Sequence, residues 1–304
     1  MNRVLLAFPV ADRQTGLFIQ RAFEQLGWEV EVVDAKERPG DTAEAFNADD
    51  FDLVFCSRTP ALLPEIRKIK AISACPVVIW NVDKRLDVRD FGPELLELFN
   101  LADLLCTAAA GNVEQYRQLC PDTRVGFLPQ GCDPDFHRIV EPTPEEGEKY
   151  ACDVMFAGSI ADGVHIGRRE LLEYLKAEGV DLKLYGPCTG QPKLTGDPLI
   201  RSYRSSKIVL GHNSGMRDLA LNSSVRDYLV MASGGFLLTE GYTGIEEYFP
   251  GMCGVYRSKE ECLEKIGYYL DHPEEREAMV QKAYQVVRTR HRYLDRIKEV
   301  VDGL

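Results

Sequence analysis

The chain has 304 residues and a formal net charge of −12, which disfavours sequence-independent binding of nucleic acid because the charge repels a polyanion. Its 45% of hydrophobic residues is enough for two buried cores, and its length predicts two domains. No apolar run approaches the roughly 20 residues that cross a bilayer, and the start lacks the long apolar region of a signal peptide, so we expect a cytoplasmic protein without a transmembrane segment.

In residues 1–139, short apolar runs alternate with segments of helical periodicity. Parallel strands need a crossover between them, usually a helix, so this alternation predicts a parallel sheet of βαβ units. The predicted strands are 4–8, 28–33, 53–56, 76–80, 102–107 and 124–128, and the predicted helices are 15–26, 61–72 and 93–99.

A charged stretch rich in Pro and Glu, 140–149, interrupts this alternation and predicts an exposed linker. A second series follows, with predicted strands at 153–157, 182–185, 207–210 and 236–238 and predicted helices at 168–178, 225–232, 262–270, 274–288 and 291–301. We therefore expect an α/β protein of two doubly wound, Rossmann-like domains that face each other across a cleft. The expected domains are 1–139 and 140–290, with a C-terminal helix, 291–304, that packs back on the first domain.

The loops after the strands hold the candidate site residues, because ligands of open parallel sheets bind beyond the carboxyl ends of the strands. Gly158 and Ser159 follow a predicted strand and offer an anion a close backbone approach and a hydroxyl, although a simple tight turn is an equal alternative. Arg226 lies in the first turn of a predicted helix that Ser224 can cap. A cation there opposes the helix dipole, so an anion in the same site would explain it; a surface arginine is the alternative.

Asp83 follows the apolar run 77–80 and is the candidate for a general base or an acceptor contact, while a carboxylate that caps a turn is equally common. The sequence has neither a G-x-G-x-x-G after the first strand nor a P-loop. No set of His, Cys or carboxylate residues has metal-ligand spacing, so we expect neither a metal nor a bound cofactor. Nine scattered cysteines without a C-x-x-C predict buried, reduced thiols.

The run from Ser224 to Glu240, S-V-R-D-Y-L-V-M-A-S-G-G-F-L-L-T-E, resembles the signature of the spore-maturation CgeB-like glycosyltransferases. These are similar to the large group of nucleotide-sugar transferases with the GT-B fold. The likeness continues through Gly244–Phe249 and includes the upstream segments Asp153–Ser159 and Trp80–Asp83. It is good over about residues 153–300 and loose over 1–139.

The resemblance implies metal-independent transfer of a hexosyl or related sugar from a nucleotide-diphosphate sugar to an acceptor, which could be a glycan, a protein or a small molecule. The donor would lie mainly on the second domain, where Arg226 would meet the diphosphate and Arg168 would add a second cation. The other positions expected to line the donor site are Gly158, Ser159, Gly186, Asn213, Ser224, Glu240, Thr243 and Gly244. The acceptor, with Asp83 as its base, would lie on the first domain.

One position departs from the pattern of this group. Its members carry a glutamate three residues after the arginine, where it is expected to hold the ribose hydroxyls, whereas this chain has Leu229. An apolar side chain accepts no hydrogen bond, so either Glu240 or Asp227 holds the ribose or its binding has changed. A non-catalytic binding module and a nucleotide-sugar epimerase or phosphorylase of the same fold are the alternatives that remain open.

Overall fold

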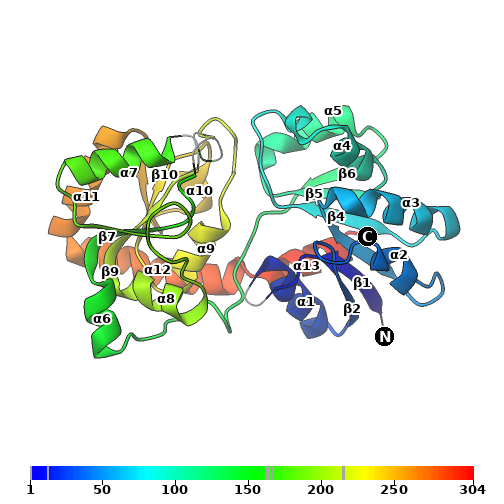
Figure 1. Cartoon of the computed structure of the whole chain (residues 1–304), viewed down its shortest axis with the longest axis horizontal. Helices are drawn as coiled ribbons and strands as arrows, with labels where there is room; N and C mark the ends of the chain where they lie inside the picture. Colours follow the sequence, from blue (N-terminus) through cyan, green and yellow to red (C-terminus); the bar gives the residue numbers. More distant parts are fainter. Residues whose placement is uncertain (1, 12–13, 162–164, 166, 214–215) are drawn as a thin grey trace. The chain divides into compact units, whose positions relative to one another are not determined.

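The computed structural model describes residues 2–11, 14–161, 165, 167–213 and 216–304. Contacts divide the chain into two compact units (Figure 1): unit 1 comprises Met1–Gln130 with Tyr293–Leu304, and unit 2 comprises Gly131–Arg292. Residues 131–139 therefore belong with the second unit in the structure. Among the helices of the described residues, none is both long and apolar enough to cross a membrane.

Unit 1 is built on a six-stranded parallel sheet with the strand order β2-β1-β3-β4-β5-β6. The direction of the connections reverses between β1 and β3, which makes the space between their carboxyl ends a topological switch point. All six strands predicted for residues 1–139 are confirmed. They are β1 (Arg3–Phe8), β2 (Glu29–Asp34), β3 (Leu53–Ser57), β4 (Val77–Asn81), β5 (Leu104–Thr107) and β6 (Arg124–Phe127).

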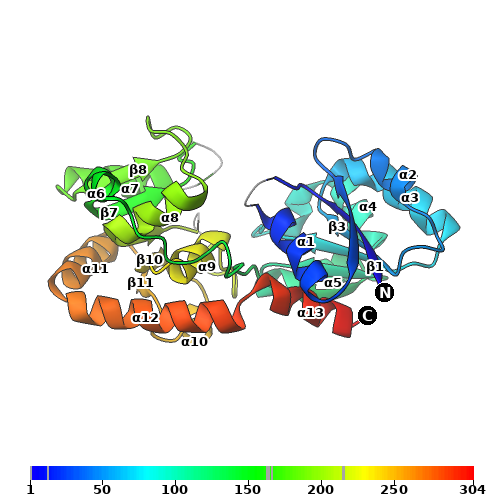
Figure 2. The same cartoon turned by 90° about the horizontal axis from the view of Figure 1, so that it is seen from below.

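Alternate side chains of this sheet are buried under two layers of helices, as the period of two along a strand requires. One face, with Val54 and Ile79, packs against the helices that follow β2 to β5. These are α2 (Asp41–Ala45), η1 (Pro60–Leu62), α3 (Leu63–Ile72), η2 (Val88–Phe91), α4 (Pro93–Asn100), η3 (Ala110–Asn112) and α5 (Val113–Leu119). The other face packs against α1 (Thr15–Gln25) and α13 (Tyr293–Asp302), which lie side by side in Figures 1 and 2.

Aromatic rings fill the second face of unit 1. Phe23 of α1 lies edge-on to Phe55 with ring centroids 5.5 Å apart, and Tyr293 of α13 lies edge-on to Trp80 at 6.0 Å. All four rings are at most 1% exposed, so the last helix of the chain contributes to the core of unit 1.

Unit 2 is built on a five-stranded parallel sheet with the order β11-β10-β9-β7-β8. Counted from β7, this is the same order as in unit 1, so the switch point lies between β7 and β9. The strands are β7 (Cys152–Ala157), β8 (Leu182–Tyr185), β9 (Ser206–Gly211), β10 (Leu237–Glu240) and β11 (Gly254–Tyr256). The sequence patterns do not predict β11, because three residues are too few to show an alternation.

Helices cover both faces of this sheet as well (Figure 1). The helices of unit 2 are α6 (Pro144–Tyr150), α7 (Arg168–Ala177), α8 (Gly196–Ser205), α9 (Val225–Ala232), α10 (Ile245–Tyr248), α11 (Lys259–Asp271) and α12 (Pro273–Arg290). The face of the sheet with Val154 and Phe156 packs against α7 and α11, and the face with Met155 packs against α8, α9 and α12.

The expectation of a linker over 140–149 is wrong for its second half, where α6 forms. Thr143 caps this helix: its hydroxyl accepts from the backbone N–H of Glu146, and the Glu146 carboxylate accepts from that of Thr143. The sequence Thr-Pro-Glu-Glu is a capping box, a local signal that outweighs the charged composition.

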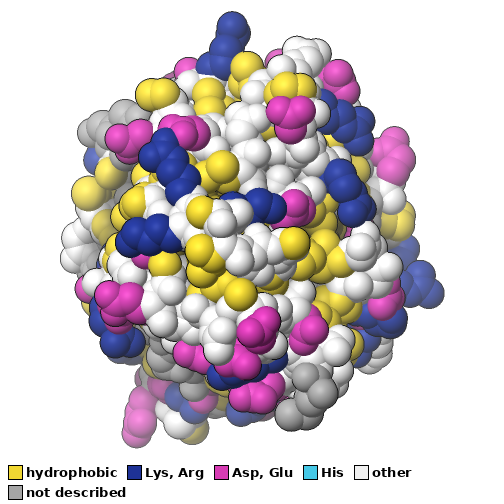
Figure 3. Space-filling model, turned by 90° about the vertical axis from the view of Figure 1, so that its right-hand side faces the viewer, with side chains coloured by type: hydrophobic (Ala, Val, Ile, Leu, Met, Phe, Trp, Pro, Cys, Tyr) yellow, Lys and Arg dark blue, Asp and Glu magenta, His cyan; other side chains and the backbone are white. Residues whose placement is uncertain are grey.

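The expectation of buried thiols is confirmed for all the cysteines but one. Eight of the nine cysteines are buried and Cys188 is exposed. Burial raises the pKa of the Cys106 thiol to about 12, which makes it unreactive. On the face shown in Figure 3, acidic and basic side chains are interspersed, and ion pairs such as Lys70 with Asp103 (2.9 Å) occur in unit 1.

Candidate functional site: an arginine pair in unit 2

The carboxyl end of β7 carries two guanidinium groups against one aromatic ring. The Cζ atom of Arg226 lies 4.8 Å from the centroid of the Phe156 ring, and that of Arg168 lies 5.2 Å from it. Each guanidinium is attracted to the electron-rich face of the ring. We call Arg168 and Arg226 the arginine pair.

Hydrogen bonds tie the arginine pair to the ends of two strands. Arg226 donates from Nε and Nη2 to the carbonyl oxygen of Ala157, at 3.2 and 2.9 Å. Arg168 donates from Nη1 to the carbonyl of Ser159 at 2.7 Å and from Nη2 to that of His212 at 3.1 Å. These carbonyls lie at or just after the ends of β7 and β9, which flank the switch point, so the pair lies where ligands of such sheets bind.

The charges of the arginine pair favour an anion. Burial, and then the neighbouring charge of Arg226, lower the pKa of Arg168 to about 9. In the part of the chain that the structure describes, no carboxylate forms an ion pair with Arg226. A phosphate between or beside the two guanidiniums would relieve their repulsion and accept charge-assisted hydrogen bonds from both.

Two glycines bring the strand ends close to the arginine pair. A Cβ atom at Gly158 would lie 2.6 Å from Nη2 of Arg226, so a larger residue there would require this guanidinium to move. Gly186, after β8, has φ 124°, and a Cβ there would lie 2.7 Å from the Gly158 carbonyl oxygen. Both glycines are among the positions expected to line the donor site; in the structure, Gly158 makes room for the Arg226 guanidinium and Gly186 for the backbone of Gly158.

The helix α9 positions Arg226 through its first turn. The backbone N–H of Ser224 donates to Asp227 Oδ2 at 2.8 Å, and the Ser224 hydroxyl donates to Oδ1 at 3.1 Å. These bonds fix the start of the helix, with Arg226 between the two capping residues. Asp227 is 1% exposed, and its carboxylate is used by this cap.

A second buried carboxylate connects the loops after β9 and β10. Glu240 is 1% exposed and accepts from the backbone N–H of Asn213 and from Nε of Arg217, both at 2.9 Å. His212 Nδ1 lies 3.7 Å from Glu240. Burial lowers the pKa of His212 to about 4, with the neighbouring arginines adding to the effect and Glu240 opposing it. Glu240 and Asn213 thus hold this loop beside the arginine pair.

The two acids expected to replace the missing ribose ligand at Leu229 therefore both have protein partners. Asp227 accepts from Ser224, and Glu240 accepts from Asn213 and Arg217. Leu229 is half-buried on α9. A ribose held by either acid would compete with hydrogen bonds that shape the site.

Arg217 also lines a pocket of about 450 Å³ on the loops after β10 and β11. Two residues singled out in the sequence, Thr243 and Gly244, line the same pocket. The Thr243 N–H donates to the Arg217 carbonyl at 3.0 Å, and Gly244 has φ 87°, which favours glycine. Arg217 links this pocket to the buried Glu240.

Asp83, the candidate base, lies in unit 1 after β4. Its carboxylate forms an ion pair with Arg58, which follows the neighbouring strand β3. Its N–H donates to Asn81 Oδ1 at 3.1 Å, and its side chain is 43% exposed. The carboxylate is thus oriented by a cation and still reachable from solvent.

Sequence reasoning misses the ring that both arginines contact. Phe156 lies inside a strand, where burial explains a phenylalanine fully, and no local signal marks its contacts. Arg217 is also missed, because its link to Glu240 joins residues 23 positions apart. Among the described residues, no group of three His, Cys, Asp or Glu side chains could hold a metal ion.

Residues 168–302 match the model of a family described as glycosyl transferase-like. This region contains Arg168, Arg226, Glu240 and the pocket residues. No curated protein sequence matches the chain.

Solved structures match almost the whole chain at low identity. Sucrose-phosphate synthase from Thermosynechococcus elongatus has a TM-score of 0.72 at 10% identity, over 100% of this chain and 99% of that one. Anabaena HepE, solved with UDP-glucose, has a TM-score of 0.69 at 13% identity, over 99% of this chain and 100% of that one. Trehalose 6-phosphate synthase from Burkholderia multivorans has a TM-score of 0.68 at 12% identity, over 99% of this chain and 97% of that one. The chain therefore has the predicted GT-B fold of two Rossmann-like units, and its residues 168–302 match the model of a glycosyl transferase-like family.

Proposed function

We propose that this protein is a glycosyltransferase that moves a sugar from a nucleotide-diphosphate sugar to an acceptor, and that it is related to the CgeB-like enzymes. The arginine pair at the switch point of unit 2 is the observation that carries the proposal. Two guanidiniums pack on one aromatic ring at the carboxyl end of a strand, where ligands of parallel sheets bind. Both arginines lie within the region that matches the glycosyl transferase-like family.

In the proposed reaction, the bond between the anomeric carbon and the diphosphate breaks, and negative charge develops on the departing phosphate oxygen. The arginine pair would stabilise this charge more strongly than that of the intact donor, which is how preorganised cations lower a barrier. Because two guanidiniums supply the positive charge, we propose that transfer needs no divalent metal.

On the acceptor side, we propose that Asp83 takes the proton from the acceptor hydroxyl as its oxygen bonds to the anomeric carbon. The ion pair with Arg58 would orient the carboxylate for this step. Asp83→Asn removes the base but preserves the shape of the side chain. We expect this variant to lose transfer while it still binds the donor.

The nucleotide is the first thing to test. HepE is solved with UDP-glucose, which makes UDP and UDP-glucose the leading candidates here. Isothermal titration against UDP, GDP, ADP and TDP should find at least one that binds, and failure of all four would overturn the donor assignment.

Catalysis needs a separate measurement. Release of free nucleotide from the sugar donor, unchanged by EDTA, is expected of a metal-independent transferase. Binding without any release, across a panel of sugar acceptors, would instead support a non-catalytic binding module. Conversion of the sugar without an acceptor would support an epimerase.

A further inference from the structure

Unit 1 contains a second pair of guanidiniums against one ring. The Cζ atom of Arg85 lies 5.0 Å from the centroid of the Phe91 ring, and that of Arg58 lies 5.6 Å from it. Arg58 follows β3 and Arg85 follows β4, so both lie at the carboxyl edge of the sheet near Asp83. We call Arg58 and Arg85 the basic cluster of unit 1.

One charge of this cluster has no carboxylate partner. Asp83 pairs with Arg58, whereas Arg85 donates from Nη1 to the backbone carbonyl of Lys84 at 2.9 Å. Within the described ranges of the chain, no carboxylate forms an ion pair with Arg85. In a chain with a net charge of −12, a half-buried cation beside a second cation marks a local site for an anion.

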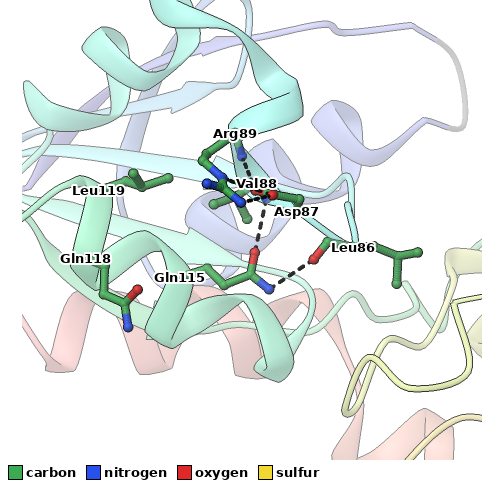
Figure 4. A pocket seen from close by; sticks show the side chains of 7 residues that line it. All are labelled: Leu86, Asp87, Val88, Arg89, Gln115, Gln118 and Leu119. Carbon is green, nitrogen blue, oxygen red and sulfur yellow. Dashed lines mark hydrogen bonds and ion pairs between the residues drawn. The ribbon is translucent and has the colours of Figure 1, made fainter.

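The segment that carries Arg85 is held in place by two amide side chains. The buried Asn112 donates from Nδ2 to the Arg85 carbonyl at 2.8 Å. Figure 4 shows Gln115 of α5, which donates to the Leu86 carbonyl and accepts from the Val88 N–H, both at 3.0 Å. Because the backbone is already fixed, an anion bound by Arg85 would lose little affinity to ordering of this segment.

We propose that the basic cluster of unit 1 binds the anionic group of the acceptor, a phosphate or a carboxylate, and that the acceptor of this protein is therefore a negatively charged sugar. The planar guanidinium donates two parallel hydrogen bonds to either group. Asp83, the proposed base, lies beside the cluster because its carboxylate forms an ion pair with Arg58. The role of the cluster as an acceptor site rests on the proposed function, whereas the existence of an anion site rests on the cluster alone.

The test keeps the two cationic sites apart. In the Arg226→Ala variant, which weakens the arginine pair, glucose 6-phosphate, glucuronate and glucose are each titrated by calorimetry. We expect at least one anionic sugar to bind about ten-fold more tightly than glucose, which corresponds to one charged hydrogen bond. The stronger of the two anionic sugars identifies the anion as phosphate or carboxylate.

Variants of the cluster then locate the anion. Arg85→Gln should reduce the binding of the anionic sugar about ten-fold and leave that of glucose unchanged, while Arg85→Lys should retain part of it. Arg89→Gln is the matched control, because Arg89 lies on the same segment, is exposed and is paired with Asp87. Thermal unfolding of each variant checks that the fold is intact.

Equal binding of glucose and both anionic sugars would overturn the proposal. The proposal would also be overturned if Arg85→Gln bound the anionic sugars as tightly as the protein without this substitution. The same holds if Arg89→Gln lost as much affinity for them as Arg85→Gln does. The proposed function fails differently: no nucleotide diphosphate binds and no nucleotide is released, whatever Arg85 does. If such a protein still bound an anion through Arg85, the anion site would be confirmed, but it could not be an acceptor site.

Discussion

Each unit of this protein places two guanidiniums against one phenylalanine, but the two rings have different surroundings. Phe91 in unit 1 is half-buried, and a carboxylate pairs with one of its arginines. Phe156 in unit 2 is fully buried, and its arginines donate to backbone carbonyls. The strand order is the same in both units, so topology alone does not decide where a diphosphate binds. We propose that the diphosphate binds in unit 2, where the ring is buried and Arg226 pairs with no carboxylate among the described residues.

The largest expected effect comes from removal of the buried ring. Phe156→Ala should lower the free energy of unfolding by about 3–5 kcal/mol, because it leaves a cavity in a well-packed core. Phe91→Ala, at the half-buried ring of unit 1, should cost clearly less. Urea unfolding measures both, and equal losses would contradict the contrast drawn between the two rings.

Low pH should weaken the protein through His212, beside the arginine pair. Its pKa is about 4 in the folded protein and about 6.5 when unfolded, so the unfolded chain binds more protons between these values. The stabilisation is complete above about pH 6.5 and is lost progressively as the pH falls through the folded-state pKa of about 4.

His212→Asn should remove this part of the pH dependence in urea unfolding between pH 7 and 4. His272→Asn, at the exposed end of α11, is the control and should keep it. If the free energy of unfolding depends on pH equally in both variants, a group other than His212 is responsible for the loss of stability.

Arg226→Ala should weaken the binding of a nucleotide diphosphate by about 1–3 kcal/mol, the range for a charged hydrogen bond. Arg58→Ala in unit 1 is the comparison variant and should leave this binding unchanged, because the diphosphate is assigned to unit 2 and the basic cluster of unit 1 to the acceptor. Calorimetry with UDP measures both. If Arg58→Ala weakens UDP binding as much, the assignment of the diphosphate to unit 2 is wrong.

The smallest effect is expected at the surface. Arg67 pairs with Glu97 in unit 1, and both side chains are about half exposed. Arg67→Ala should change the free energy of unfolding by less than about 1 kcal/mol, because water screens exposed ion pairs. A larger loss would mean that surface pairs contribute to unit 1 more than its aromatic core suggests.

Local sequence patterns are sufficient for the architecture of both units. Apolar runs of four to six residues predict nearly all the strands, and helical spacing between them predicts a parallel sheet. The strand β11 is missed because it has only three residues, and α8 is missed although it is amphipathic. The position of Arg226 at a helix start follows from Ser224 and Asp227, which lie within one helical turn.

The sequence by itself thus determined two doubly wound units and a helix with an arginine in its first turn. Only the tertiary structure decided what that arginine touches, since Arg226 meets the carbonyl of Ala157, 69 positions away. The pairing of Arg58 with Asp83 spans 25 positions in the same way. Period and capping act over a few residues, whereas the charge of a site depends on which distant side chains the packed sheets bring together.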